Sequence, residues 1–291
     1  MESQRDPVLD RIAAWAADRD DVRAALLTST RAVPGGKVDV LSDYDVILVV
    51  RNVRPYVDDH AWIEDFGPVL VAYWDPVAPD FQQASNVVQY EGALKIDFGV
   101  WSVEKMNQIV AMPELPDEFD AGYKVIVDKD GLTNELAAPT GCGYVTSLPG
   151  EDTYLTLVND FFIGVPYVAK CLLRDEILPA KWCLDYDMRY VYLLPMLEWL
   201  AAVSKGGEVK VGVNGKGLKR LLPTGWWDDL EATWAGGDVE GNWSSLFSMA
   251  ELFGRAGRVV ANDRGFTYPE NLHQRVVGHA HAMRAGEFGL P

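Results

Sequence analysis

Cysteine, histidine and basic residues are scarce in this sequence of 291 residues. The three cysteines, Cys142, Cys171 and Cys183, are an odd set without the paired spacing of a zinc site, so we expect reduced core residues and no disulfide scaffold. The N-terminus lacks the apolar run of a signal peptide, and no later stretch approaches the roughly 20 uncharged apolar residues that span a bilayer. We therefore expect a cytoplasmic protein without a membrane partner.

The shortage of basic residues gives the chain a strong negative charge. Lysine and arginine number 26 against 43 aspartates and glutamates, a formal net charge of −17. This surplus argues against binding to nucleic acid or to an anionic membrane, and it suits a cationic ligand. The alternative is that the acid only keeps the protein soluble. With 48% hydrophobic residues, the composition is that of a folded globular protein and not of a disordered chain.

The first 140 residues mix predicted helices and strands. Asp6 followed by Pro7 is typical of a helix start, and apolar residues then recur at helical spacing. Short β-branched and aromatic runs predict strands over residues 22–27, 46–50, 69–74, 87–90, 94–101 and 123–127. Residues 103–112 return to a helical pattern, and Pro34 with the two glycines after it predicts a turn.

The pattern changes after residues 139–143, which are rich in glycine and mark the predicted domain boundary. Helical periodicity then predicts helices over about 152–175, 178–204, 241–263 and 270–285. We expect Gly164 and Pro166 to interrupt the first of these, Pro195 to kink the second and Asn242 to cap the third. The predicted fold class is α+β, with a mixed sheet and helices over residues 1–140 and an all-helical domain over 141–291.

Asp43 and Asp45 stand two residues apart at the start of an aliphatic run. On one strand they would point to the same face, with α-carbons roughly 7 Å apart. Like charges at this range disfavour double ionisation unless a cation lies between them, and Mg²⁺ prefers carboxylate and phosphate oxygens. Both are therefore candidate metal ligands and catalytic residues for a phosphoryl-type displacement. The alternative is a solvated strand end.

Asp97 is a lone carboxylate within an apolar strand, where an ionised group is expensive to bury without a partner. If its strand lies beside the one that carries Asp43 and Asp45, Asp97 completes the cation site or accepts the proton of an attacking hydroxyl. The alternative is an edge-strand residue that faces water. Glu91 precedes Asp97 by six residues in a predicted hairpin and is a second candidate for the general base.

Two further sets of residues are candidates for binding phosphate. Ser29, Thr30 and Arg31 follow an aliphatic strand, and their N–H, O–H and guanidinium donors suit phosphate oxygens, although a simple loop explains the three residues better when they are taken alone. Lys170 and Arg174 are four residues apart on one helical face. They would reach triphosphate oxygens across a cleft, or form an exposed basic stripe paired with nearby acids.

The turn at Ser29, the spacer and the Asp43-x-Asp45 pair together resemble the nucleotidyltransferase fingerprint of a Gly-Ser turn, a spacer and Asp-x-Asp. Segments of the second half look like the aminoglycoside 6-adenylyltransferase family, also called streptomycin adenylyltransferases. These segments are residues 167–177, 209–222, 226–227, 230–238, 242–247 and 266–270. The resemblance runs in order from about residue 8 to 285.

The resemblance implies a nucleotidyltransferase domain and a helical domain that completes a cleft for ATP, Mg²⁺ and the acceptor. It implies roles for six residues: triphosphate binding by Ser29, Thr30 and Arg31, and metal binding by Asp43, Asp45 and Asp97. The family's turn reads Gly-Ser-Arg, whereas Ser29 stands here at the glycine position. Because glycine allows positive φ and a close backbone approach, the side chain of Ser29 would narrow the nucleotide pocket or reduce activity.

The predicted function is therefore Mg²⁺-dependent transfer of AMP from ATP to a hydroxyl of an aminoglycoside such as streptomycin, with release of pyrophosphate. Such a reaction confers antibiotic resistance. One alternative is transfer to another antibiotic or a metabolite. Another is a catalytically silent relative that only holds a nucleotide or drug, which the serine at position 29 favours and the three aspartates oppose.

Overall fold

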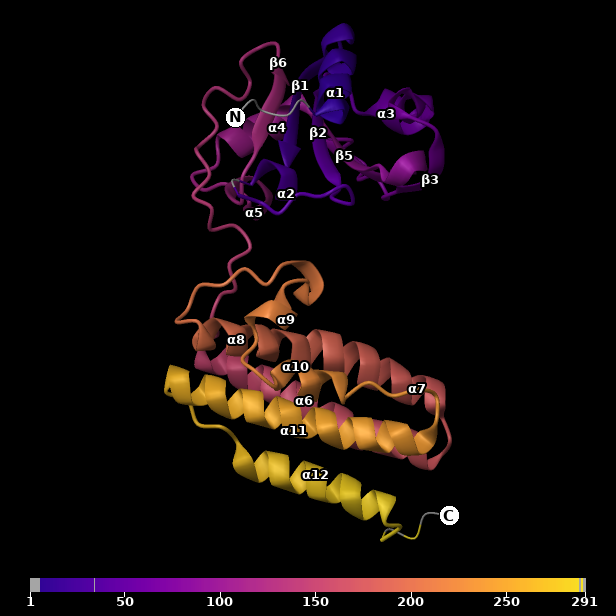
Figure 1. Cartoon of the computed structure of the whole chain (residues 1–291), viewed down its shortest axis with the longest axis vertical. Helices are drawn as coiled ribbons and strands as arrows, with labels where there is room; N and C mark the ends of the chain where they lie inside the picture. The colour runs from indigo at the N-terminus through magenta and orange to yellow at the C-terminus, as the bar shows by residue number, and fades with distance from the viewer. Residues whose placement is uncertain (1–5, 34, 288, 290–291) are drawn as a thin grey trace. The chain divides into compact units, whose positions relative to one another are not determined.

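The computed structural model describes residues 6–33, 35–287 and 289. The chain divides into two compact units, Met1–Tyr144 and Val145–Pro291 (Figure 1). We call them the sheet unit and the helical unit. The architecture is α+β, as predicted, and the functional roles assigned to the two domains stay predictions.

The sheet unit is built on a six-stranded mixed sheet in the order β3-β4-β5-β2-β1-β6. The strands are β1 (Val22–Thr28), β2 (Tyr44–Val50), β3 (Val69–Trp74), β4 (Gln83–Tyr90), β5 (Lys95–Ser102) and β6 (Lys124–Asp128). Each lies at a predicted run, although β4 begins four residues earlier than expected. Strands β2 and β5 pair in parallel, and every other pairing in the sheet is antiparallel.

Helices cover both faces of this sheet (Figure 1). The helical elements are α1 (Pro7–Asp18), α2 (Ser29–Ala32), α3 (Arg54–Asp58), η1 (Ala61–Phe66), η2 (Glu91–Ala93), α4 (Val103–Val110) and α5 (Asp117–Asp120). Ile12 and Trp15 of α1 pack on one face, while Met106 of α4 and Phe119 of α5 pack on the other. Burial on both faces explains the nearly continuous aliphatic runs of β1 and β2.

The start of α1 confirms the predicted cap. Asp6 accepts hydrogen bonds from the backbone N–H groups of Val8 and Leu9, and Pro7 occupies the first turn, where no N–H partner is needed. The turn predicted at Pro34 involves a position outside the described residues.

The helical unit contains seven α-helices and two other helical segments within the part of the chain that the structure describes. They are α6 (Glu151–Leu173), α7 (Ile177–Lys181), the π-helix η3 (Trp182–Leu193), α8 (Leu194–Ser204), η4 (Val213–Gly215), α9 (Leu218–Leu221), α10 (Trp226–Glu231), α11 (Val239–Arg264) and α12 (Glu270–Arg284). Four long predicted helices thus exist, but the second is divided into α7, η3 and α8. Its wide π-helical turns were not predicted.

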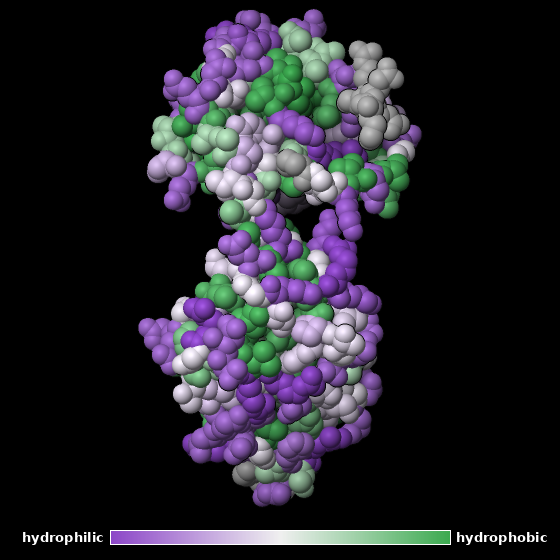
Figure 2. Space-filling model, turned by 60° about the vertical axis from the view of Figure 1, so that its left-hand side comes forward, coloured by the Kyte–Doolittle hydropathy of each residue, from purple (hydrophilic) through white to green (hydrophobic). Residues whose placement is uncertain are grey.

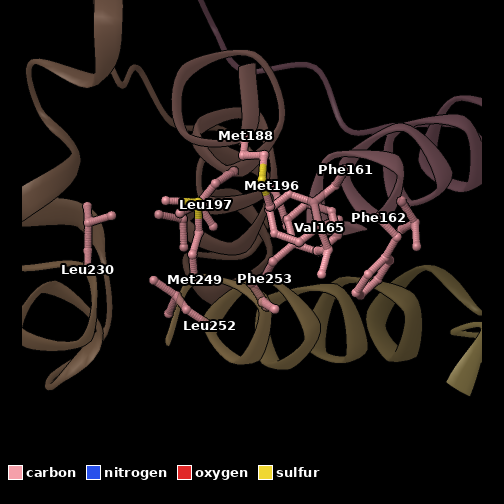
Figure 3. Close-up of a cluster of buried hydrophobic side chains, with 14 of the residues drawn as sticks. Phe161, Phe162, Val165, Met188, Met196, Leu197, Leu230, Met249, Leu252 and Phe253 are labelled. Carbon is pink, nitrogen blue, oxygen red and sulfur yellow. The ribbon is translucent and has the colours of Figure 1, made fainter. Parts of the chain in front are cut away.

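The core of the helical unit is aromatic and aliphatic (Figure 3). Phe161 of α6 stacks on Phe253 of α11 with ring centroids 3.8 Å apart and an interplanar angle of 2°. Hydrophilic side chains cover much of the face of this unit that Figure 2 shows, with smaller hydrophobic groups between them. Cys171 and Cys183 are buried free thiols, as expected, whereas Cys142 is exposed, so the prediction that it is a core residue was wrong.

Helix α6 runs without a break through Gly164 and Pro166, so the predicted interruption was wrong. Gly164 is needed for packing, because a Cβ there would lie 2.7 Å from Cγ of Met188. Tertiary packing outweighs the local cost of the proline. By length and composition α6 could also cross a membrane, which the sequence did not suggest, but half of its most apolar window is buried within the protein.

The predicted cap of α11 was also wrong. Asp238, not Asn242, accepts the hydrogen bond from the backbone of Gly241. Asn242 lies in the first turn, where its side chain donates to the carbonyls of Gly236 and Asp238. An aspartate four residues upstream competes for the same role, and the periodic pattern alone does not decide between them.

Candidate active site

The parallel pairing of β2 and β5 brings two of the predicted acids together. Asp45 on β2 and Asp97 on β5 are direct partners in the register of the two strands. Asp43 directly precedes β2, two residues from Asp45. The carboxylates that the sequence placed in two distant groups therefore lie at the same end of the two central strands.

Lys95 joins these carboxylates. Its Nζ lies 2.7 Å from Oδ2 of Asp43 and 2.7 Å from Oδ2 of Asp97. Burial alone would lower the pKa of Lys95, but the hydrogen bonds to Asp43 and Asp97 raise it above its ordinary value, so the side chain stays an ammonium ion. Lysine is thus the counter-ion of the two acids in this structure.

The burial of Asp45 and Asp97 is energetically unfavourable. Burial raises the pKa of Asp45, and the charge of Asp97 raises it further, while a hydrogen bond from Ser29 and the charge of Lys95 lower it. The Oδ1 atom of Asp97 is buried and has no hydrogen-bond partner among the described residues. Such an acceptor is expensive unless a donor or cation reaches it.

The fit of these residues to a metal ion is incomplete. Carboxylate oxygens are the ligands that Mg²⁺ prefers, and Oδ1 of Asp97 is buried without a hydrogen-bond partner among the described residues. However, no group of three or more His, Cys, Asp or Glu side chains within the described residues is placed to hold a metal ion. Lys95 instead occupies one oxygen of Asp43 and one of Asp97. In this arrangement the acids do not form a divalent-metal site, and metal binding by Asp43, Asp45 and Asp97 stays a prediction.

The predicted phosphate turn follows β1 directly. Ser29 begins the one-turn helix α2 with φ at +61°, a left-handed conformation that favours glycine. The backbone therefore adopts a geometry that glycine would adopt without strain, and the serine hydroxyl bonds to Asp45. Thr30, the next residue of α2, is exposed. Phosphate binding by these two residues stays a prediction.

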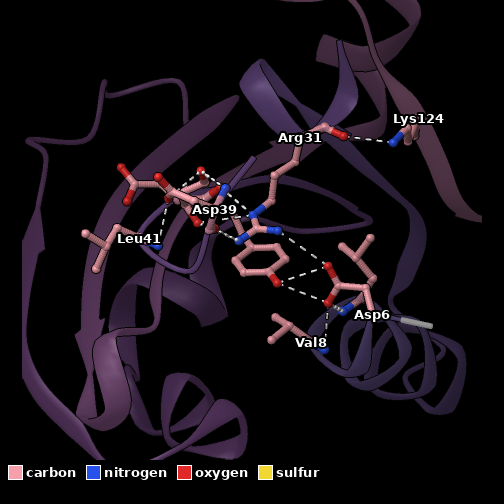
Figure 4. Close-up of polar contacts among 10 residues, drawn as sticks. Asp6, Val8, Arg31, Asp39, Leu41 and Lys124 are labelled. Carbon is pink, nitrogen blue, oxygen red and sulfur yellow. Dashed lines mark hydrogen bonds and ion pairs between the residues drawn. The ribbon is translucent and has the colours of Figure 1, made fainter. Parts of the chain in front are cut away.

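Arg31 holds the loop before Asp43 (Figure 4). Its Nε donates to the backbone carbonyls of Ser42 and Asp43, each at 3.1 Å, and its guanidinium stacks on Tyr44 at 3.8 Å from the ring centroid. Nη1 lies 3.6 Å from Oδ2 of Asp6. The guanidinium is thus engaged with the protein, which makes Arg31 a residue that positions Asp43. Its predicted contact with triphosphate would require some of these bonds to open.

A cavity of about 280 Å³ opens beside the acids on the same face of the sheet. Its lining includes Thr28, Asp45, Ser85, Asp97, Trp101 and Glu118. Glu118 belongs to α5, and burial raises the pKa of its carboxyl group. Acceptor oxygens dominate these side chains, so the cavity suits a ligand that brings hydrogen-bond donors or positive charge.

The remaining predicted residues lie elsewhere. Glu91 is exposed in the turn η2 of the β4–β5 hairpin, and it is not among the residues that line the cavity. Lys170 lies near the end of α6 in the helical unit, exposed, with Nζ 5.9 Å from the ring centroid of Tyr167. Arg174 is the exposed residue that ends α6. Their predicted roles in catalysis and nucleotide binding stay predictions.

Sequence reasoning missed two charged residues of this site, Lys95 and Glu118. Lys95 stands two residues before Asp97, so the two-residue period of a strand would have placed it on the same face. Glu118 gives no such signal, because only the packing of α5 on the sheet brings it to the cavity.

Comparisons with known proteins identify the family of the chain and several relatives. The family model for streptomycin adenylyltransferase matches residues 1–283. An aminoglycoside 6-adenylyltransferase of Bacillus subtilis (strain 168) is 26% identical over 280 residues, covering 93% of this chain and 94% of the relative. One of Staphylococcus aureus is 24% identical over 267 residues, covering 90% and 92%. A crystal structure of an aminoglycoside 6-adenyltransferase from Bacillus subtilis aligns over 97% of this chain and 99% of its own, with 20% identity and a TM-score of 0.47.

Proposed function

Because the chain belongs to the streptomycin adenylyltransferase family, we propose that it transfers an adenylyl group from ATP to a hydroxyl of an aminoglycoside such as streptomycin. The relatives named as aminoglycoside 6-adenylyltransferases support this substrate class. The observation that carries the proposal is the placement of Asp45 directly beside Asp97, at the edge of a cavity rich in acceptor oxygens.

In this reaction the acceptor oxygen attacks the α-phosphorus of ATP, the bond from that phosphorus to the β-bridging oxygen breaks, and pyrophosphate leaves. The hydroxyl proton passes to a carboxylate of the protein. Asp97 is better supported as that base than Glu91, because Asp97 lines the cavity and its Oδ1 has no hydrogen-bond partner among the described residues, whereas Glu91 is exposed in a turn.

The other residues of the sheet unit would bind and orient the substrates. The turn at Ser29 and Thr30 would offer N–H and O–H donors to the triphosphate, and Arg31 keeps the loop before Asp43 in place. Glu118 would face positive charge on the acceptor. We retain Mg²⁺ as part of the proposal, since a bound divalent ion would neutralise phosphate charge and polarise the reacting oxygens. Lys95 now pairs with one oxygen each of Asp43 and Asp97, so it would move aside for an ion to bind to those oxygens.

We also propose that the helical unit contributes to substrate binding. In this proposal Lys170 and Arg174 donate hydrogen bonds to the triphosphate. We also propose a cytoplasmic location, where ATP is available. The net charge of −17 would draw a cationic acceptor toward the protein.

A substrate screen tests this function. We expect pyrophosphate release from ATP only in the presence of an aminoglycoside, together with a mass increase of the acceptor by one adenylyl group. Aminoglycosides with and without the streptomycin ring system, non-aminoglycoside antibiotics and other nucleoside triphosphates form the comparison set. If the adenylyl group is transferred only to another class of acceptor, the proposed aminoglycoside substrate is wrong and that class is the substrate. Nucleotide or drug binding without any product would support the silent relative instead.

A further inference from the structure

We infer that Lys95 is a built-in cation of the carboxylate site, which a divalent ion has to displace before it can bind to Asp43 and Asp97. The inference rests on the proposed function only in its use of a divalent ion. It concerns what this chain does in the absence of nucleotide and acceptor.

The geometry is that of a bridging counter-ion. The ammonium group of Lys95 makes two ion pairs of 2.7 Å, each to the Oδ2 atom of a different aspartate. Its side chain is only 24% exposed, so the lysine is held within the site and does not extend into solvent. Asp45, the partner of Asp97 across the strands, adds a third carboxylate to the same end of the sheet. Without a cation, the repulsion between these groups would be uncompensated.

The two cations compete for the same oxygens. A divalent ion takes carboxylate oxygens at about 2.0–2.6 Å, and an ammonium group held on the same atoms repels it by like charge. The other oxygen of Asp97, Oδ1, is buried and has no hydrogen-bond partner among the described residues. An ion therefore takes the Oδ2 atoms of Asp43 and Asp97 only when Lys95 withdraws.

Metal binding measured on the whole protein tests the inference. Mn²⁺ is titrated into the full chain, without nucleotide or acceptor, and free Mn²⁺ is measured by electron paramagnetic resonance. We expect Lys95→Met, which removes the charge and keeps the length, to bind Mn²⁺ about tenfold more tightly than the unchanged protein. Lys95→Arg, which keeps the charge, should stay within about twofold of the unchanged protein.

Lys181→Met is the matched control. The side chain of Lys181 is 25% exposed and makes one ion pair of 2.7 Å with Asp185, in the helical unit. Its replacement removes a lysine of similar burial and pairing, and it should leave Mn²⁺ affinity unchanged. Circular dichroism of each variant checks that the fold is retained.

A second measurement uses the unchanged protein and does not depend on the folding of a variant. Acylation of lysines is followed by mass spectrometry with and without Mn²⁺. If the ion displaces Lys95, labelling of Lys95 should rise severalfold with Mn²⁺, while labelling of Lys181 should not change.

Two results overturn the inference. Lys95→Met that binds Mn²⁺ no more tightly than the unchanged protein, or labelling of Lys95 that does not rise with Mn²⁺, would show that the lysine does not compete with the ion. In either case the proposed adenylyl transfer stands. A protein that binds no Mn²⁺ in any form would overturn the inference and also remove the metal from the proposed function.

Discussion

The two units bury charged groups in different settings. In the helical unit the buried Arg189 donates to Thr233 and Asp185, although its Nε has no partner within the described residues. In the sheet unit, three carboxylates gather around Lys95, and one oxygen of Asp97 likewise has no partner within the described residues. The first is a single cation paired with one acid, whereas a cluster of like charges is typical of a functional site. Substitutions in the two units separate these roles.

The largest effect is expected at Asp45. Asp45→Asn keeps the shape of the side chain and removes its charge, so adenylyl transfer should fall by at least about 10³-fold while the helical unit is unaffected. Product formation under saturating ATP and acceptor measures this. Asp58→Asn, at an exposed aspartate of the same unit, is the control and should keep full activity. Near-normal turnover by Asp45→Asn would mean that the active site does not lie at Asp45 in the sheet unit.

The stability of the helical unit should depend on the packing of its core. Phe253→Ala removes the ring stacked on Phe161 and should lower the free energy of unfolding by about 3–5 kcal/mol. Leu178→Ala, at a leucine 80% exposed, should change it by less than about 0.5 kcal/mol. Denaturant titration followed by tryptophan fluorescence gives both values. Equal effects of the two substitutions would contradict the assignment of Phe253 to a core that stabilises the unit.

The cost of the carboxylate site should depend on pH. Because burial and the charge of Asp97 raise the pKa of Asp45, the folded protein holds that proton to a higher pH than the unfolded chain does. The contribution of Asp45 to stability therefore falls as pH rises from the ordinary aspartate range through the raised pKa, and it then levels off. Asp45→Asn removes this contribution.

Denaturant titrations of both proteins between about pH 4 and pH 8, without divalent ions, check the sign. The stability of Asp45→Asn relative to the unchanged protein should increase with pH and then reach a plateau. A difference that shrinks as pH rises would mean that Asp45 is stabilised as a carboxylate.

The smallest effect is expected at Ser29. Ser29→Gly relieves the left-handed backbone and should stabilise the protein by up to about 1 kcal/mol, reduced by loss of the hydrogen bond to Asp45. If this turn holds the triphosphate, the affinity for a nonhydrolysable ATP analogue should rise by a few-fold. Ala93→Gly is the matched control, since Ala93 has φ at +65° in the hairpin turn. Ala93→Gly should change stability but not nucleotide affinity. A similar gain in nucleotide affinity from Ala93→Gly would mean that the gain in Ser29→Gly does not come from contact between this turn and the nucleotide.

Much of the fold could be predicted because it follows local patterns. The run of β-branched and aromatic residues at Val69–Trp74 coincides with β3, and the last predicted helix coincides with α12 to within one residue. Predictions failed where distant residues decide the outcome. Gly164 and Pro166 lie within a continuous helix because the surrounding core favours it, and that core is not visible in a local window.

The site shows the same division. The two-residue spacing of Asp43 and Asp45, and the lone acid Asp97, pointed to residues that the parallel strands do bring together. The same spacing applied to Lys95 and Asp97 would have indicated the bridging ion pair. The involvement of Arg31 in holding the loop before Asp43 depends on how that loop folds back, which no short-range pattern contains.

The central claim is that adenylyl transfer takes place at the site formed by Asp45 and Asp97. A crystal structure of the protein with a nonhydrolysable ATP analogue and Mg²⁺ tests this directly. We expect the triphosphate beside these two aspartates, within hydrogen-bond distance of the turn at Ser29, and the ammonium group of Lys95 away from Asp43. A nucleotide bound elsewhere, with Lys95 still bridging Asp43 and Asp97, would contradict the account.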